Sequence, residues 1–147
     1  MAHDRLTPVS PELRSKYPHF GKGDAEVWEQ WLYDHQDQIT HVYYDIALGG
    51  VTIDDPDVDP AMARAWKYDT AIKIDAVVVM TEENLIVEVK PYARMGAIGQ
   101  ALGYAMLLDD EPLNELPNTP CIVTLGTTAE VLKVAEAFGI RVDVVTV

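Results

Sequence analysis

The sequence predicts an α/β domain in which a mixed central β-sheet is flanked by helices. Apolar residues recur at helical spacing in three segments, and five other segments are short runs rich in Val, Ile and aromatic residues. The chain closes with a strand, a helix and a strand, which favours a parallel crossover. We therefore expect the order helix, three strands, helix, strand, helix, strand in one domain over residues 21–147, preceded by an extended N-terminal arm over residues 1–20.

The helices are predicted from three amphipathic segments. The first is GKGDAEVWEQWLYDH, with Asp24 as its expected N-cap and with Val27, Trp28, Trp31 and Leu32 recurring on one face. The other two are MGAIGQALGYAMLL and TAEVLKVAEAFG, the last of which ends in a glycine. The glycines of the second segment lie in a helical pattern rather than in a strand-to-helix turn, so they do not form a phosphate loop. We expect Gly96, Gly99 and Gly103 to allow close packing of this helix on the sheet.

The strands are predicted from β-branched runs that are bounded by turn residues. In chain order they are HVYYDIAL, AIKIDAVVVM, NLIVEVK, CIVTLG and RVDVVTV. The second and third are joined by a polar turn at residues 81–84 and form a hairpin. Residues 49–66, between the first and second strands, form a long acidic connection with two prolines. Loops of that length inside compact domains are often functional.

The composition indicates a cytoplasmic protein. The chain has no apolar run long enough to span a membrane, and its first residues lack the apolar block of a signal peptide. The lone Cys121 cannot form an internal disulfide.

The charge argues against ordinary nucleic-acid binding. Twenty-four acidic residues against eleven basic ones give a net charge of −13. Phosphate neutralisation supplies most of the affinity for nucleic acid, so a local basic patch or a partner must compensate. Arg64, Lys67 and Lys73, beside Trp66 and Tyr68, have two interpretations: a small surface for a nucleic-acid strand, or ordinary surface charges near a packed tryptophan.

The predicted hairpin carries the residues with the clearest chemistry. Asp75 interrupts the apolar run of one strand and Glu88 that of the next, and Lys90 lies on the same face as Glu88. An ionised carboxylate inside such a run is costly unless it meets a cation or a hydrogen-bond donor. Hard oxygen ligands of this kind suit Mg²⁺. The alternative is structural: Lys90 forms a salt bridge with one of the two acids at the end of the sheet.

These pieces resemble the PD-(D/E)XK nuclease superfamily, especially its small members similar to archaeal Holliday-junction resolvases and phage nucleases. The matching segments are KGDAEVWEQWL, KIDAVVV, LIVEVK and IGQALGYAMLL, in the order of the family. The resemblance implies a restriction-endonuclease-like core and a Mg²⁺ site that also accepts Mn²⁺. Two departures are the replacement of the proline of the family motif by Ile74 and the insertion around residues 49–66.

The resemblance also implies roles for individual residues. Asp75 and Glu88 would hold the metal with the backbone carbonyl of Val89, and Lys90 would position the attacking water. Glu26 on the first helix would complete the site, with Glu29 as the reserve candidate. Gln100 on the helix after the lysine strand has two interpretations, a supporting residue or a solvated helix residue. The implied catalytic set is Glu26, Asp75, Glu88, Lys90 and Gln100.

The expected function is therefore hydrolysis of DNA phosphodiester bonds by a Mg²⁺-dependent deoxyribonuclease. DNA is the expected partner, with a second copy or another protein supplying affinity where the acidic surface does not. The rival hypothesis is a catalytically silent protein of the same fold that acts through protein contacts, as a phage particle component or a subunit of a nuclease complex. The acidic surface favours this rival, because it suits protein contacts better than DNA capture.

Overall fold

The computed structural model describes residues 20–147, so the arm expected over residues 1–20 lies, apart from Phe20, outside the described part. The described residues form helices and strands. The helices are α1 (Lys22–His35), a short 3-10 helix η1 (Gln36–Gln38), α2 (Pro60–Thr70), α3 (Met95–Asp110) and α4 (Ala129–Ala137). The strands are β1 (Ile39–Leu48), β2 (Ile72–Met80), β3 (Asn84–Lys90), β4 (Asn118–Thr124) and β5 (Arg141–Val144).

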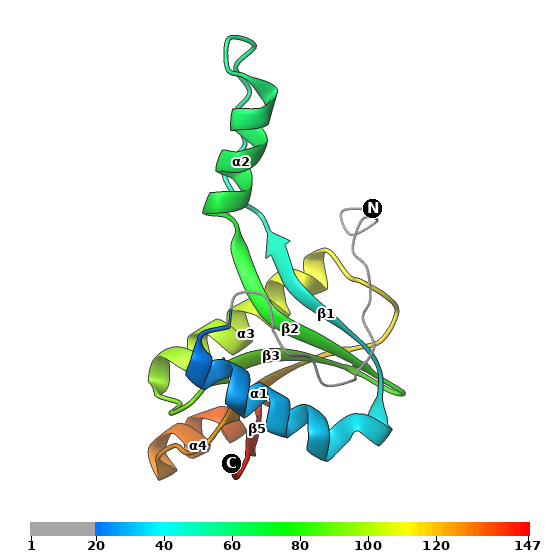
Figure 1. Cartoon of the computed structure of the whole chain (residues 1–147), viewed down its shortest axis with the longest axis vertical. Coiled ribbons are helices and arrows are strands. Elements are labelled where there is room, and N and C mark those ends of the chain that lie inside the picture. Colours follow the sequence, from blue (N-terminus) through cyan, green and yellow to red (C-terminus); the bar gives the residue numbers. More distant parts are fainter. Residues whose placement is uncertain (1–19) are drawn as a thin grey trace.

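The strands form one mixed sheet in the order β1-β2-β3-β4-β5 (Figure 1). The first three pair antiparallel, because short turns or a projecting connection join them. The last two pairs are parallel, because α3 and α4 provide the crossovers that parallel strands need. The prediction of a mixed sheet flanked by helices is confirmed.

Helix α1 covers one face of the sheet. Its rings Trp28 and Trp31 are fully buried and stack at 5.0 Å between centroids. Each indole N–H donates a hydrogen bond to the sheet, Trp28 to the Tyr44 hydroxyl at 2.9 Å and Trp31 to Asp143 at 2.7 Å. Burying two large aromatic side chains, each with its polar group satisfied, fixes this helix across β1 to β5.

Helices α3 and α4 cover the opposite face (Figure 1). Ile98 and Ala101 of α3 pack with Ile122 of β4 and Val131 of α4. The expectation that the three α3 glycines allow close packing on the sheet is wrong. A Cβ atom added at Gly96, Gly99 or Gly103 would meet nothing within 4 Å, so this edge of the helix faces open space.

The segment expected as an insertion over residues 49–66 leads into a helix that the sequence interpretation missed, α2, which continues to Thr70. Asp59 caps α2 by accepting a hydrogen bond from the Ala61 N–H at 2.8 Å, and Pro60 occupies the first turn. An N-cap aspartate followed by proline is a standard helix start, so the signal was present. No residue of α2 is buried, and the helix projects away from the sheet (Figure 1).

None of the helices within residues 20–147 is both long enough and apolar enough to cross a membrane.

Candidate metal centre

The β2–β3 ladder ends where the candidate residues begin. Paired positions run from Val79 opposite Asn84 to Ala76 opposite Val87, and Asp75 and Glu88 occupy the next step. There the Asp75 carboxylate, rather than a β2 carbonyl, accepts the Val89 N–H at 3.0 Å. The two strands therefore part at this step, and a carboxylate fills the opening between them.

Glu88 lies inside the protein with one oxygen unsatisfied. The residue is 2% exposed, and its Oε2 atom has no hydrogen-bond partner within residues 20–147. Its Oε1 atom lies 3.4 Å from Lys90 Nζ, whose side chain is 42% exposed and reaches the surface. Because an unpartnered buried carboxylate oxygen is costly, this atom marks a place where a cation would be favourable.

The two acids disturb each other's titration. Burial and the neighbouring Asp75 charge raise the pKa of Glu88 to about 7, although the Lys90 ammonium opposes this shift. Burial also raises the pKa of Asp75, while the Val89 N–H and the Lys90 charge act in the opposite direction. Two carboxyl groups crowded into one partly dry site form the electrostatic setting that a divalent cation relieves.

Helix α3 contributes Tyr104 and Gln100 to the edge of this site. Burial, with the charges of Glu88 and Asp75, raises the pKa of the half-buried Tyr104 to about 12. Gln100 is exposed and interacts with the Tyr104 hydroxyl. The phenol therefore stays protonated beside the two acids, and the amide of Gln100 lies one contact further out.

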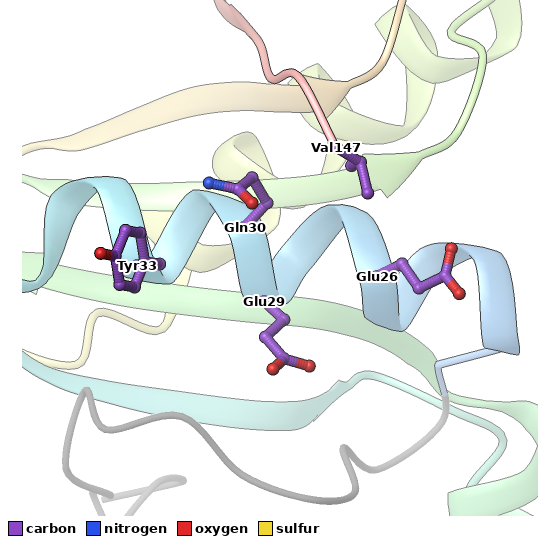
Figure 2. Close-up of a pocket in the computed structure, with 5 residues that line it drawn as sticks. All are labelled: Glu26, Glu29, Gln30, Tyr33 and Val147. Carbon is purple, nitrogen blue, oxygen red and sulfur yellow. The ribbon is translucent and has the colours of Figure 1, made fainter.

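The structure does not bring Glu26 to the two carboxylates. Glu26 and Glu29 are exposed on α1, where they line a hollow of about 450 Å³ with Gln30, Tyr33 and Val147 (Figure 2). Their placement follows from Val27 and Trp28, which are fully buried and so turn the adjoining positions outward. The role of Glu26 at the site therefore stays a prediction without geometric support.

The acid of α1 whose charge reaches the site is Asp24. Its charge acts to raise the pKa of Asp75. Asp24 precedes Val27 and Trp28 by three and four positions, so it shares their sheet-facing side of the helix. That spacing was visible in the sequence and would have distinguished Asp24 from Glu26.

Asp45 is a second acid that sequence reasoning missed. It lies in β1 between Tyr44, which pairs with Ala76, and Ile46, which pairs with Ile74, and this places it opposite Asp75. Its φ of 52° is in the left-handed region, which is unusual for a residue other than glycine and occurs often at functional sites. The Tyr68 hydroxyl of α2 donates a 2.5 Å hydrogen bond to the Asp45 carboxylate. No periodicity in the sequence predicts a left-handed residue in mid-strand.

Side chains alone give this centre two carboxylates. Across the part of the chain that the structure describes, no group of three or more His, Cys, Asp or Glu side chains is placed to hold a metal ion together. A backbone carbonyl is a further oxygen that could contribute to a cation site here. In alternate residues of β3, the backbone N–H and carbonyl groups point toward β4. The Asn84 N–H, for example, donates at 2.9 Å to the carbonyl of Pro117, the residue just before β4. Val89 occupies one of the intervening positions, so its carbonyl and its N–H both point toward β2 and Asp75.

Comparisons with known proteins give the fold and little more. No family model matches the chain, and no curated protein does. A solved protein of unknown function is 16% identical, with a TM-score of 0.50, over 82% of this chain and 55% of its own. A repair endonuclease from Pyrococcus abyssi is 20% identical, with a TM-score of 0.43, over 50% of this chain and 32% of its own. The chain thus spans about half of the first protein and a third of the second, and the first likeness supports a shared fold.

Proposed function

We propose that this protein is a Mg²⁺-dependent deoxyribonuclease that hydrolyses DNA phosphodiester bonds and accepts Mn²⁺ in place of Mg²⁺. The observation that carries the proposal is the meeting of Asp75, Glu88 and Lys90 at the open end of the β2–β3 ladder. The two strands of one hairpin thus supply two acids and one basic residue to a single partly buried point.

The residues present fit a hard divalent cation. The ligands would be the carboxylates of Asp75 and Glu88 and the carbonyl of Val89, an all-oxygen set that leaves room for the several waters that Mg²⁺ retains. The Oε2 atom of Glu88, which has no hydrogen-bond partner among the described residues, supports a cation at this point. A metal ion would lower the pKa of a bound water and neutralise charge on the phosphate.

The other side chains have roles that follow from their positions. Lys90 contacts Glu88 while keeping its side chain partly in solvent, so it can hold an attacking water against the phosphate and stabilise negative charge that develops there. Asp24 would support the site from α1 by orienting solvent near Asp75. Tyr104 stays protonated and can donate its O–H, while Gln100 remains peripheral.

The proposal is tested by incubating purified protein with branched, linear duplex and single-stranded DNA in the presence of Mg²⁺ or Mn²⁺. We expect cleavage of at least one substrate that depends on the metal and is lost in Glu88→Gln. Glu130→Gln, which makes the same change on the exposed start of α4, is the matched control and should cleave normally. The absence of cleavage on every substrate, or cleavage that survives Glu88→Gln, would overturn the proposal.

The net charge favours a second candidate, a catalytically silent protein of this fold that acts through protein contacts. The two candidates differ in whether the protein binds a divalent metal ion through Asp75 and Glu88. Isothermal titration of Mn²⁺ into the wild type and into Asp75→Asn separates them, because a silent protein should show no binding that depends on this carboxylate.

A further inference from the structure

The projection, which we define as residues 49–71, contains helix α2 although none of its residues is buried. Trp66 and Tyr68 are 50% and 41% exposed, and α2 has no buried residue. An isolated helix of about one dozen residues is marginal in water, so contacts at the base of the projection must hold it. An exposed helix that buries no core residue is more readily explained by a role in binding than by a role in packing.

The base contacts fix the direction of the projection. Gly50 has a φ of +94°, and a Cβ atom added there would lie 2.2 Å from the Lys67 carbonyl oxygen, so the two segments touch backbone to backbone. The Val51 N–H donates to Thr70 Oγ1 at 2.7 Å. Lys73 Nζ donates to the Tyr68 carbonyl at 2.8 Å and lies 4.4 Å from the centre of the Tyr68 ring.

The charge of α2 is opposite to that of the whole chain. Arg64 and Lys67 are three positions apart on one helix face, and Lys73 follows at the base. Between residues 60 and 73 the only acidic residue is Asp69. The segment that leads into α2 is acidic, with Asp54, Asp55, Asp57 and Asp59, so the projection as a whole carries net negative charge and its positive charge is confined to α2 and its base. The face of α2 that carries Arg64 and Lys67 is the part that complements a polyanion.

A hollow lies between the start of β2, at the base of the projection, and helix α3. It has a volume of about 510 Å³, and its lining includes Lys73 of β2 and, from α3, Gln100, Tyr104 and the three glycines Gly96, Gly99 and Gly103. A Cβ atom at these glycines would meet no other atom within 4 Å, so their missing side chains leave the space open. Tyr104 lines the hollow and also has a side-chain hydrogen bond with Glu88, so the hollow and the candidate metal centre share this residue.

We propose that the basic face of α2 and this hollow form a track for one DNA strand, leading to Asp75 and Glu88. Arg64, Lys67 and Lys73 contact successive phosphates, and a base enters the largely apolar hollow. The assignment rests on the proposed function. A single strand fits better than a duplex, because duplex DNA carries about one charge per 1.7 Å of its axis and is repelled more strongly by the acidic remainder of the protein.

The test measures binding without cleavage. A fluorescently labelled single-stranded oligonucleotide is titrated with the full chain in EDTA, and the dissociation constant is read by anisotropy over a range of salt concentrations. Lys67→Glu should weaken binding about tenfold or more and reduce the salt slope by about 0.7 for the lost phosphate contact. Lys133→Glu, the same charge change on exposed α4, is the matched control and should stay within about twofold of the wild type.

A second variant tests the hollow itself. Gly99→Glu places a negative side chain in open space, so the protein should keep its melting temperature while its affinity for the strand falls. Gly99→Ala controls for the helix, because it adds one methyl group and no charge. Unfolding of Gly99→Glu is detected by circular dichroism, and Lys67→Glu then carries the test.

Three results would overturn the proposal. One is equal affinity in the wild type, Lys67→Glu and Gly99→Glu. Another is tighter binding of duplex than of single-stranded DNA. The third is conversion of a dimer to a monomer by Lys67→Glu in analytical ultracentrifugation, which would make the projection a contact with a second copy. Because the assay contains EDTA, binding that depends on Lys67 in a protein that never cleaves DNA would reject the nuclease and keep the track. DNA cleavage that does not depend on Lys67 would keep the nuclease and reject the track.

Discussion

Asp45 of β1 lies opposite Asp75 of β2, and the alternation of side chains reverses in both strands at this step. In β1, Tyr44 packs on the α1 side and Ile46 on the α3 side, although strand alternation should place both on one face. In β2, Ile74 and Ala76 show the same reversal. Because both strands shift together, their pairing register is kept, and Asp75 is turned toward the opening beside Glu88.

This relationship predicts that the Asp45 side chain stabilises the structure, whereas its left-handed backbone does not. A left-handed residue other than glycine costs about 1 kcal/mol, which Asp45→Gly would recover. The same change removes the hydrogen bond from Tyr68, worth about 1 kcal/mol. We therefore expect a small net change in the free energy of unfolding, measured by urea titration, together with faster amide exchange in residues 60–70. Unchanged exchange would mean that Asp45 does not hold the projection.

Lys90→Ala should separate metal binding from catalysis. Lys90 carries a positive charge beside Glu88, so removing it should leave Mn²⁺ affinity unchanged or stronger in isothermal titration. The cleavage rate at saturating metal should nevertheless fall by about 100-fold or more, because a group that stabilises charge in the transition state is lost. A Lys90→Ala protein that cleaves at the wild-type rate would show that this lysine forms only a structural salt bridge.

The sequence singled out the acids and the lysine of the β2–β3 hairpin, whose joint role as a site stays a prediction, and it missed an acid whose backbone departs from regular strand geometry. Asp75, Glu88 and Lys90 were found because a charge inside a Val and Ile run is conspicuous, and strand pairing then brings them together. Asp45 was missed because its role depends on a left-handed backbone that no residue pattern shows.

The helices also differ in how well the sequence pattern predicted them. Strong apolar spacing located α1, α3 and α4, whereas α2 buries nothing and so lacks the periodic signal that reveals a helix. The glycines of α3 were assigned to packing because sequence gives their spacing and not the side of the helix that faces the sheet.

Asp24→Asn and Glu26→Gln should have different effects on the affinity of the protein for Mn²⁺. The Asp24 charge reaches Asp75, so its removal should weaken Mn²⁺ binding several-fold in isothermal titration. Glu26 is exposed in a separate hollow, and Glu26→Gln should leave the affinity within about twofold of the wild type. The reverse order of effects would restore Glu26 as the acid that completes the site.

The stability of the metal-free protein should fall as the pH rises from about 4.5 to about 7. The pKa of Glu88 is raised in the folded state to about 7 from an ordinary value of 4.5, so the folded state holds a proton that the unfolded state has released. The favourable contribution is complete below the unfolded pKa and is lost as the pH passes through the folded pKa. Melting temperatures in EDTA should show this decline, and Glu88→Gln, which cannot ionise, should flatten it. An equal decline in both proteins would assign it to other groups.

The Gly50 contact can be tested against its neighbour. Gly50 and Gly49 both have positive φ values, +94° and +69°, but only at Gly50 would a Cβ atom collide, 2.2 Å from the Lys67 carbonyl oxygen. Gly49→Ala therefore reports the backbone strain alone, expected at about 1 kcal/mol. Gly50→Ala adds a clash with backbone that cannot yield cheaply, so it should destabilise the protein more and release α2, seen as rapid amide exchange over residues 60–70. Equal effects of the two alanines would mean that the close approach of these segments does not hold the projection in place.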